Sequence, residues 1–308
     1  MRRFFLRLVQ LNRSRTLGKV WLSVLCAVTN APSPLARRIA DTIQPSQAIP
    51  TGRNLPSIEI AIACSAKDLD LLPASVSFSL RNVLNPVDAV KVLVPDNELE
   101  EAQKTEASAV FLGERALLPE SLLGAVERTH SPGRYGWMLQ QVLKLYFAFQ
   151  SSAEGVLVLD ADTLLTRPRR FLAADKKQLL SFSQEYFSPY EEHATRVWGA
   201  RRRYKGFSFV THHQLMQPWV VREMFPTLSD LIGWVRRASR DHKSTLSEYH
   251  SYGRWLCDNY PDFVKLARWE NKSISRNSFP SLEPKSLEEH VRRRFPGYFS
   301  VSLHSYRH

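Results

Sequence analysis

The chain has 308 residues, of which 44% are hydrophobic, so it can form a substantial core and shows no long disordered tract. Its three cysteines, Cys26, Cys64 and Cys257, lie far apart and form no CxxC pair, which argues against a disulfide framework and a thiolate zinc site. A reducing compartment, and therefore a cytoplasmic location, is expected.

The first 53 residues carry most of the net charge of +12. They hold nine Lys and Arg residues against one acid, Asp41, and so account for eight of those charges. Apolar residues such as Phe4, Phe5 and Trp21 lie between the basic ones, a pattern that favours an amphipathic helix on an anionic membrane over nucleic acid. The uncharged run 20–36 is short and proline-containing, which argues against a membrane span. We expect peripheral contact with the inner face of the plasma membrane; a solvated arm and a late signal peptide are the alternatives.

Five prolines between residues 31 and 56 indicate a linker, so we divide the chain into an arm with its linker, 1–53, and a catalytic domain, 54–308. The domain opens with apolar runs of strand length at 57–65, 90–95 and 108–114. Between them, 74–84 and 96–104 have helical patterns. Strands that alternate with helices predict an α/β domain with a parallel sheet.

A longer helix, 134–150, is predicted by apolar residues at helical spacing, and Gln141 and Lys144 adjoin that apolar stripe. The strand that follows, VLVLDADTLL, ends in Asp160 and Asp162. Ligands of open parallel sheets gather at the carboxyl ends of the strands, and two carboxylates separated by one residue point the same way in an extended chain. The pair is therefore predicted to bind one divalent cation, Mg²⁺ or Mn²⁺.

The tripeptide DxD alone allows other interpretations. One is a structural pair of aspartates in a cap or loop. Another is a phosphatase of the haloacid-dehalogenase type, in which the first aspartate is the nucleophile. Leu164 stands where that family usually has Thr or Val, and the motif comes late in the domain. The later acids Asp258 and Asp262 also lack the glycine that usually introduces such a pair.

Four segments in this order, RYGWMLQQVLKLYFAF, VLVLDADTLLTRP, FVTHHQLM and SEYHSYGRWL, resemble the GT-A superfamily of glycosyltransferases. More narrowly, they look like a bacterial glycosyltransferase-like group of undefined specificity. The resemblance covers residue 57 to the C-terminus. It implies a GT-A-like fold with a Rossmann-type mixed, mainly parallel sheet flanked by helices. The implied activity is metal-dependent transfer of a sugar from a nucleotide-sugar donor to a glycan or lipid-linked acceptor, in cell-surface polysaccharide synthesis.

The resemblance, together with the chemistry of the residues near these segments, also suggests site residues. The metal ligands would be Asp160, Asp162 and His304, holding Mn²⁺ or Mg²⁺. Donor contacts would come from the loop after the first strand, from the long helix and from the DxD, namely Ser65, Lys67, Asp68, Gln141, Lys144 and Asp160. Glu248 would be the general base, and the acceptor would meet His212, His213, Tyr249 and Trp255.

Several of these residues have ordinary structural explanations. Lys144 can be a solvated helix lysine, Glu248 a partner of Ser247 in a helix cap, and the paired histidines a packing or capping element. Arg196 and the basic residues at 201–205 suit an anionic acceptor or the donor phosphates, although most charge runs are only solvated. No nucleic-acid partner is expected. A non-catalytic membrane or carbohydrate adaptor is a further alternative for the whole chain.

Overall fold

The computed structural model describes residues 55–183, 186–199, 208–238 and 244–305; the predicted N-terminal arm lies outside these ranges. Its centre is a five-stranded sheet in the order β3-β2-β1-β4-β7, in which only β7 runs antiparallel to its neighbour. The strands span Ile58–Ala63 (β1), Val87–Val94 (β2), Val110–Gly113 (β3), Val156–Asp160 (β4) and His213–Met216 (β7). The predicted α/β fold, with a mixed, mainly parallel sheet flanked by helices, is confirmed.

The strands expected at 57–65, 90–95 and 108–114 correspond to β1, β2 and β3. The helix expected at 74–84 is α4 (Leu72–Asn82), and the long helix is α8 (Tyr135–Gln150). The pattern at 96–104 forms a 3₁₀ turn followed by the short α5 (Leu99–Gln103). The agreement is close because β1 apart from Glu59, and β4 up to Asp160, are apolar on both faces, as central strands of a covered parallel sheet are.

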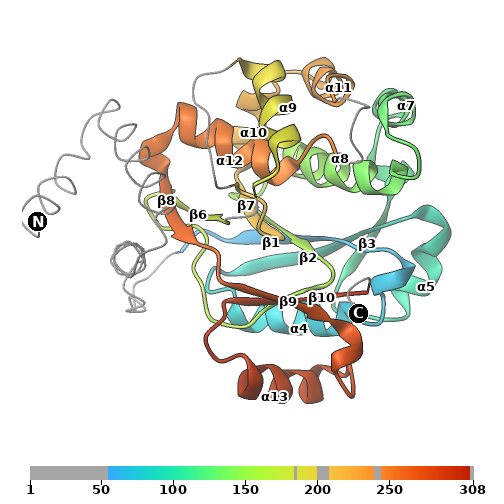
Figure 1. Cartoon of the computed structure of the whole chain (residues 1–308), viewed down its shortest axis with the longest axis vertical. Helices are drawn as coiled ribbons and strands as arrows, with labels where there is room; N and C mark the ends of the chain where they lie inside the picture. The colour runs from blue at the N-terminus through green and yellow to red at the C-terminus, as the bar shows by residue number, and fades with distance from the viewer. Residues whose placement is uncertain (1–54, 184–185, 200–207, 239–243, 306–308) are drawn as a thin grey trace, which may run out of the picture.

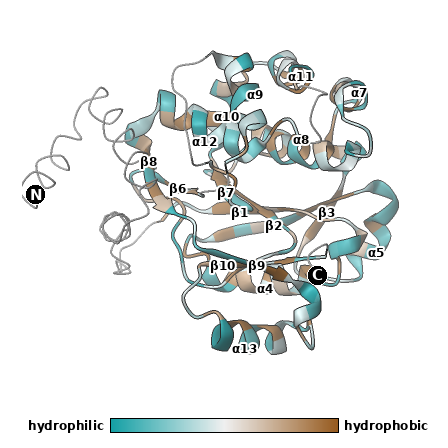
Figure 2. Ribbon diagram, in the orientation of Figure 1, coloured by the Kyte–Doolittle hydropathy of each residue, from teal (hydrophilic) through white to brown (hydrophobic). Residues whose placement is uncertain are grey.

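A layer of helices covers one face of the sheet (Figure 1). Their apolar side chains form one core cluster with alternate residues of the strands, among them Val156 and Val158. Figure 2 shows apolar strands inside and hydrophilic ribbon on the outer helices. Besides α8, the helices on this side include α7 (Glu120–Thr129), α10 (Pro218–Met224), α11 (Leu228–Arg236) and α12 (Glu248–Asn259), with α9 (Ser188–Trp198) packed on α12.

The other face is covered by α4, which is itself enclosed by a second, three-stranded sheet of order β5-β10-β9 and by α13 (Pro284–Arg294). The strands of that sheet are β5 (Thr163–Leu165), β9 (Asn271–Ser275) and β10 (Ser300–His304). The predicted terminal strand is thus confirmed as β10. The described residues also include a two-stranded sheet, β6 (Gln178–Phe182) with β8 (Val264–Arg268), and the short α6 (Glu114–Leu117).

Within the described residues, no helix is both long and apolar enough to cross a bilayer.

Candidate functional site

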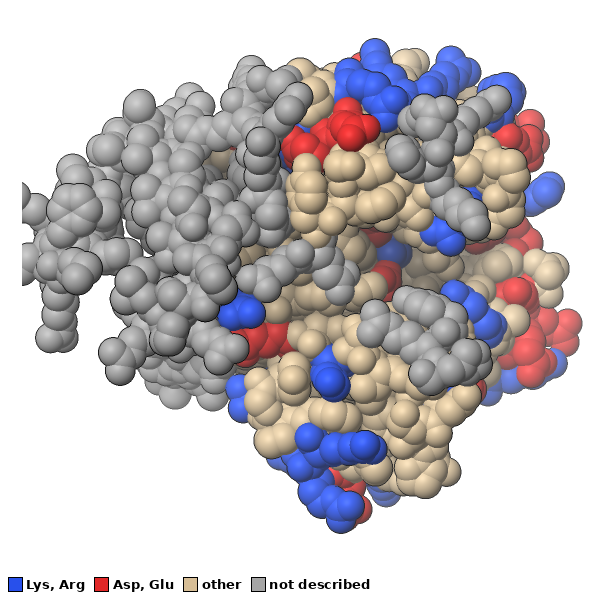
Figure 3. Space-filling model, in the orientation of Figure 1, with Lys and Arg blue, Asp and Glu red and all other residues tan. Residues whose placement is uncertain are grey.

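The site forms where β4 ends. Asp160 is the last residue of β4 and stands in register with Ala63 of β1, so it lies at the carboxyl edge of the central sheet. Successive side chains of a strand point to opposite faces, and Asp160 therefore shares the face of Val156 and Val158, toward α8 and α12. Figure 3 shows a hollow between the upper helical layer and the lower sheet layer in which acidic and basic side chains meet.

Lys144 of α8 reaches this edge from the helical layer that covers the sheet (Figure 1). Its side chain is 3% exposed, and its Nζ forms ion pairs with Oδ1 of Asp160 and, at 2.9 Å, with Oε1 of Glu248. Tyr249 donates its hydroxyl to Oδ1 of Asp160 at 3.0 Å, and the ammonium lies 4.7 Å from the centre of its ring. The alternative of a solvated helix lysine is therefore wrong. A buried ammonium is stable only with such partners, because desolvation otherwise costs several kcal/mol.

The charges of this cluster are set by burial and by the shared lysine. Burial alone would raise the pKa of Asp160, but Lys144 and His212 outweigh it and hold that pKa well below its usual range. Burial alone would lower the pKa of Lys144, but Asp160 and Glu248 raise it above its ordinary value. Burial raises the pKa of Glu248 despite Lys144. Lys144 and Asp160 are thus a fixed ion pair, whereas burial disfavours the charged form of Glu248.

Glu248 does not occupy the place expected of a general base. It is completely buried, one carboxylate oxygen binds Lys144, and the other has no hydrogen-bond partner in the described structure. It is the first residue of α12, whose N-cap is Ser247, which accepts the amide hydrogen of His250. A base must reach the acceptor hydroxyl. In this arrangement Glu248 instead holds Lys144, and the capping segment anticipated around Ser247 is present as well.

His212 holds the other oxygen of Asp160. Its Nδ1 lies 2.9 Å from Oδ2 of Asp160, and its ring centre lies 5.6 Å from that of His304 and 5.3 Å from that of Trp269. Its φ is +56°, a left-handed conformation that residues other than glycine adopt with strain. This backbone turn immediately precedes β7 and directs the imidazole to the strand end. His212 therefore belongs to the aspartate cluster.

Asp162 and His304 form a second pair. β10 pairs with β5 through Ser302 and Thr163, and this register places Nδ1 of His304 2.9 Å from Oδ2 of Asp162. The Asp162 side chain is 19% exposed, so the pair is open to solvent on one side.

These atoms fit a metal ion only in part. Two neighbouring ligands of an octahedral Mg²⁺ at about 2.1 Å lie about 3 Å apart, which matches the separation of the Asp162 and His304 atoms. Asp160 was expected as a third ligand, but Lys144, Tyr249 and His212 occupy both of its oxygens. No three His, Cys, Asp or Glu residues of the described ranges are grouped as a metal site. Asp162 and His304 are thus the candidate ligands that the spacing favours. A cation shared by both aspartates stays a prediction from sequence.

The expected donor loop follows β1 at the same edge. Ser65 precedes a 3₁₀ turn, Ala66–Asp68, in which Lys67 is exposed and Asp68 is buried. Burial raises the pKa of Asp68, opposed by Lys67 and helped by the charge of Asp162, which places the loop electrostatically close to the DxD. Gln141 is buried on α8, one turn before Lys144.

Two of the expected acceptor residues lie away from the cluster. His213 follows His212 in the chain and points to the opposite face of the sheet, where it is 1% exposed and packs edge-on against Phe171. Trp255 lies two turns along α12 from Glu248 and contacts Tyr260. Tyr249 does lie in the cluster, although its hydroxyl binds Asp160. The basic residues at 201–205 lie outside the described ranges.

Sequence reasoning missed two residues of this region. Trp269 follows β8 and places its indole beside His212. Arg276 follows β9 and binds the donor loop across more than two hundred residues. No local pattern could have found either, because each reaches the site through the pairing of distant strands.

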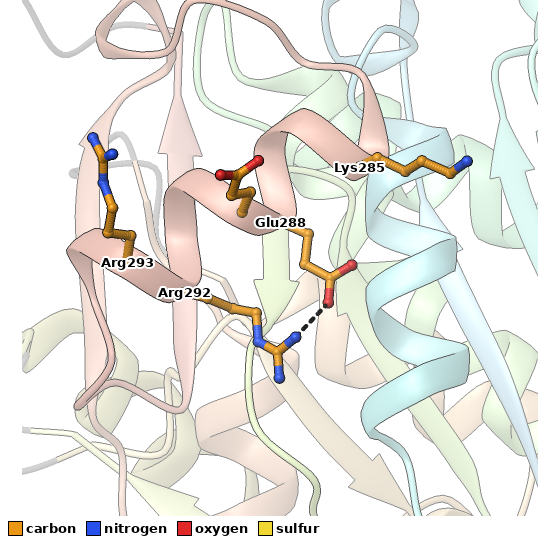
Figure 4. Close-up of a pocket in the computed structure, with 5 residues that line it drawn as sticks. Lys285, Glu288, Arg292 and Arg293 are labelled. Carbon is orange, nitrogen blue, oxygen red and sulfur yellow. Dashed lines mark hydrogen bonds and ion pairs between the residues drawn. The ribbon is translucent and has the colours of Figure 1, made fainter.

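A depression of about 470 Å³ on α13 is unrelated to this cluster. Figure 4 shows that the charged side chains that line it point in different directions, apart from Arg292, which lies 3.5 Å from Glu288. Arg292 is 77% exposed. We therefore interpret this depression as a solvated charged helix face.

No curated protein matches the chain. Among solved structures, mouse xyloside xylosyltransferase 1, in its apo form, is 12% identical with a TM-score of 0.46, covering 81% of this chain and 98% of that one. Galactosyltransferase LgtC, in complex with donor and acceptor sugar analogs, is also 12% identical, with a TM-score of 0.42 and coverage of 80% and 86%. Both likenesses concern the fold and say nothing about activity. A family model matches residues 68–276, about two thirds of the sequence, and the chain therefore belongs to the family described as a family of unknown function, DUF6492.

Proposed function

We propose that the protein is a glycosyltransferase that transfers a sugar from a nucleotide-sugar donor to a glycan or lipid-linked acceptor. The observation that carries this proposal is the pairing at one strand end: the two aspartates of the DxD each meet a histidine from a distant segment, and a buried lysine fixes the first aspartate. A diphosphate leaving group requires a fixed polar site of this kind.

In this proposal Asp162 and His304 hold Mn²⁺ or Mg²⁺. When bound, the cation would neutralise the diphosphate of the donor. Asp160 has a different role, as an orienting group. Its carboxylate stays ionised beside Lys144 and positions His212 next to His304. The loop at Ser65, Lys67 and Asp68 lies at the same sheet edge and is our candidate contact for the nucleotide, with Gln141 near Lys144 as a further one.

The contacts of Asp160 also weigh against a phosphatase. A nucleophilic aspartate needs an oxygen that can attack phosphorus, whereas Oδ1 here is bound by Lys144 and Tyr249 and Oδ2 by His212. The identity of the acceptor, a role in cell-surface polysaccharide synthesis and membrane contact through residues 1–53 at the cytoplasmic face remain predictions from sequence.

The test is a thermal-shift assay of the full chain against a panel of nucleotide sugars, with and without MnCl₂. A ligand at one hundred times its Kd stabilises the fold by about 2.7 kcal/mol, which shifts the Tm by several degrees. We expect a manganese-dependent shift with at least one donor, lost in Asp162→Asn and in His304→Gln. Asp175→Asn, at an exposed ion pair with Lys177, is the matched control and should keep the shift.

The alternatives give different results. If no nucleotide sugar raises the Tm under any metal condition, the proposal fails and an adaptor role is favoured. Hydrolysis of p-nitrophenyl phosphate that disappears in Asp160→Asn would favour the phosphatase.

A further inference from the structure

Arg276 joins two segments that are distant in sequence. It is the first residue after β9, whose Ser275 stands in register with His304 of β10. Its guanidinium therefore starts from the strand that borders the Asp162–His304 pair and extends to the loop after β1. The side chain is only 12% exposed.

The guanidinium binds three groups of this loop. Nη1 donates to the carbonyl oxygen of Lys67 at 2.6 Å and to Oδ1 of Asp70 at 3.0 Å, and Nη2 forms an ion pair with Oδ1 of Asp68. A planar guanidinium can bind all three at once because its donors form a rigid fork, whereas a lysine presents a single ammonium. Arg276 thus fixes both the backbone and the two carboxylates of the loop.

The same contacts control the charge beside the site. Asp68 and Asp70 lie in the loop, and the charge of Asp162 is felt at Asp68. Without Arg276, the Lys or Arg side chain left among the described contacts of Asp68, Asp70 and Asp162 would be Lys67. The side chain of Lys67 is 63% exposed, so it neutralises these carboxylates poorly. A diphosphate that approaches such a cluster is repelled, since like charges in a partly buried site are poorly screened.

We propose that Arg276 is a positioning residue for the donor. It holds the loop at residues 65–70 against the Asp162–His304 edge, and it partly neutralises the carboxylates of Asp68 and Asp70 so that a nucleoside diphosphate can bind. This inference rests on the proposed function, because it assumes that the ligand of this edge is a nucleoside diphosphate or its sugar ester. It assigns to Arg276 an effect on donor affinity rather than on the chemical step.

The experiment measures the affinity of UDP, GDP, ADP and dTDP with MnCl₂ by calorimetry, in the wild type and three variants. We expect Arg276→Gln to weaken the binding of the preferred nucleotide at least tenfold. Arg276→Lys should recover part of the loss, because it restores the charge without the fork. Arg292→Gln, which removes an exposed arginine that also contacts a glutamate, should bind within twofold of the wild type.

Amide hydrogen exchange without ligand provides a second measurement. The amides of Asp68 and Leu71 are bonded within the loop, and we expect their exchange to accelerate in Arg276→Gln but not in Arg292→Gln. If the wild type binds a nucleotide and Arg276→Gln binds it equally well, this inference is overturned while the proposed function stands. If the wild type binds none of the four nucleotides, this inference falls, and the nucleotide-sugar panel then decides the fate of the proposed function. In steady-state kinetics the variant should raise KM for the donor more than it lowers kcat, and the reverse result also contradicts the proposal.

Discussion

Lys144 and Glu248 lie 104 residues apart in the chain, yet the Nζ of one and Oε1 of the other are 2.9 Å apart in the protein interior. The side chains are 3% and 0% exposed. The contact joins α8 to α12 next to Asp160, so the position of the first aspartate of the DxD depends on the packing of two helices. This contact leads to the first of four predictions.

Lys144→Met removes the cation from the completely buried Glu248 and from Asp160, whose side chain is 25% exposed. Breaking a buried ion pair at one partner costs about 3–5 kcal/mol, and we expect that loss in the free energy of unfolding, measured by urea denaturation. The double variant Lys144→Met, Glu248→Gln should recover part of it, because one uncompensated charge is gone. A loss below about 1 kcal/mol in the single variant would contradict the ion pair.

His193 should make stability depend on pH. Burial lowers the pKa of this completely buried histidine from 6.5 to about 4. The unfolded chain therefore binds a proton between pH 6.5 and 4 that the folded chain does not. The contribution of neutral His193 to the free energy of unfolding is complete above pH 6.5 and is lost as the pH falls toward 4. The shift corresponds to about 3 kcal/mol.

The matched variant is His193→Gln, whose amide can still donate to the carbonyl oxygen of Trp234. Between pH 7 and 4 it should lose about 3 kcal/mol less stability than the wild type. Urea denaturation at several pH values measures this. Burial also lowers the pKa of His213, to about 3, so the free energy of unfolding of the variant should still fall somewhat with decreasing pH. Equal slopes in the two proteins would rule out the contribution of His193.

Gly253 is required by the packing of α12. A Cβ at this position would lie 2.4 Å from Cγ of Phe209, which is itself completely buried. We expect Gly253→Ala to destabilise the protein by about 1–3 kcal/mol through overpacking, as measured by chemical denaturation. Gly136, in the first turn of α8, has nothing within 4 Å of such a Cβ. Gly136→Ala should instead be neutral or stabilise by up to about 1 kcal/mol, and a similar loss in both variants would contradict the steric explanation.

His212 combines a strained backbone with a contact to Asp160. Asparagine tolerates the left-handed region and offers a donor to the carboxylate, whereas valine does neither. We expect the free energy of unfolding of His212→Asn to lie within about 1 kcal/mol of the wild-type value, and that of His212→Val to be about 1–3 kcal/mol lower. Lys176, with a φ of +63° remote from the cluster, provides the control. Lys176→Val removes only an exposed ion pair with Glu154 besides adding strain, and it should leave the ligand-induced shifts in Tm unchanged. His212→Val should diminish those shifts.

Most of the elements before the DxD could be predicted from sequence. The apolar runs of β1, β2 and β4 and the helical period of α8 are local patterns, and the parallel sheet follows from their alternation. The position of Asp160 at a strand end is of the same kind, since the apolar run VLVL stops there. The cluster could be anticipated less well. His304 was assigned beside Asp162 only by a family pattern, and the register of β10 with β5 is what brings the two side chains together.

What each residue contacts was decided by tertiary structure. The two histidines are adjacent in the sequence, but His212 lies in a left-handed turn and His213 begins β7. Their rings therefore reach opposite faces of the sheet, and only His212 meets Asp160. Sequence also offered Glu248 as a base, yet packing of α12 against α8 buries it on Lys144. The sequence by itself determined the elements and the carboxylates at a strand end, because side-chain periodicity is local. Only the tertiary structure decided their partners, because those contacts depend on strand register and helix packing between segments far apart in the chain.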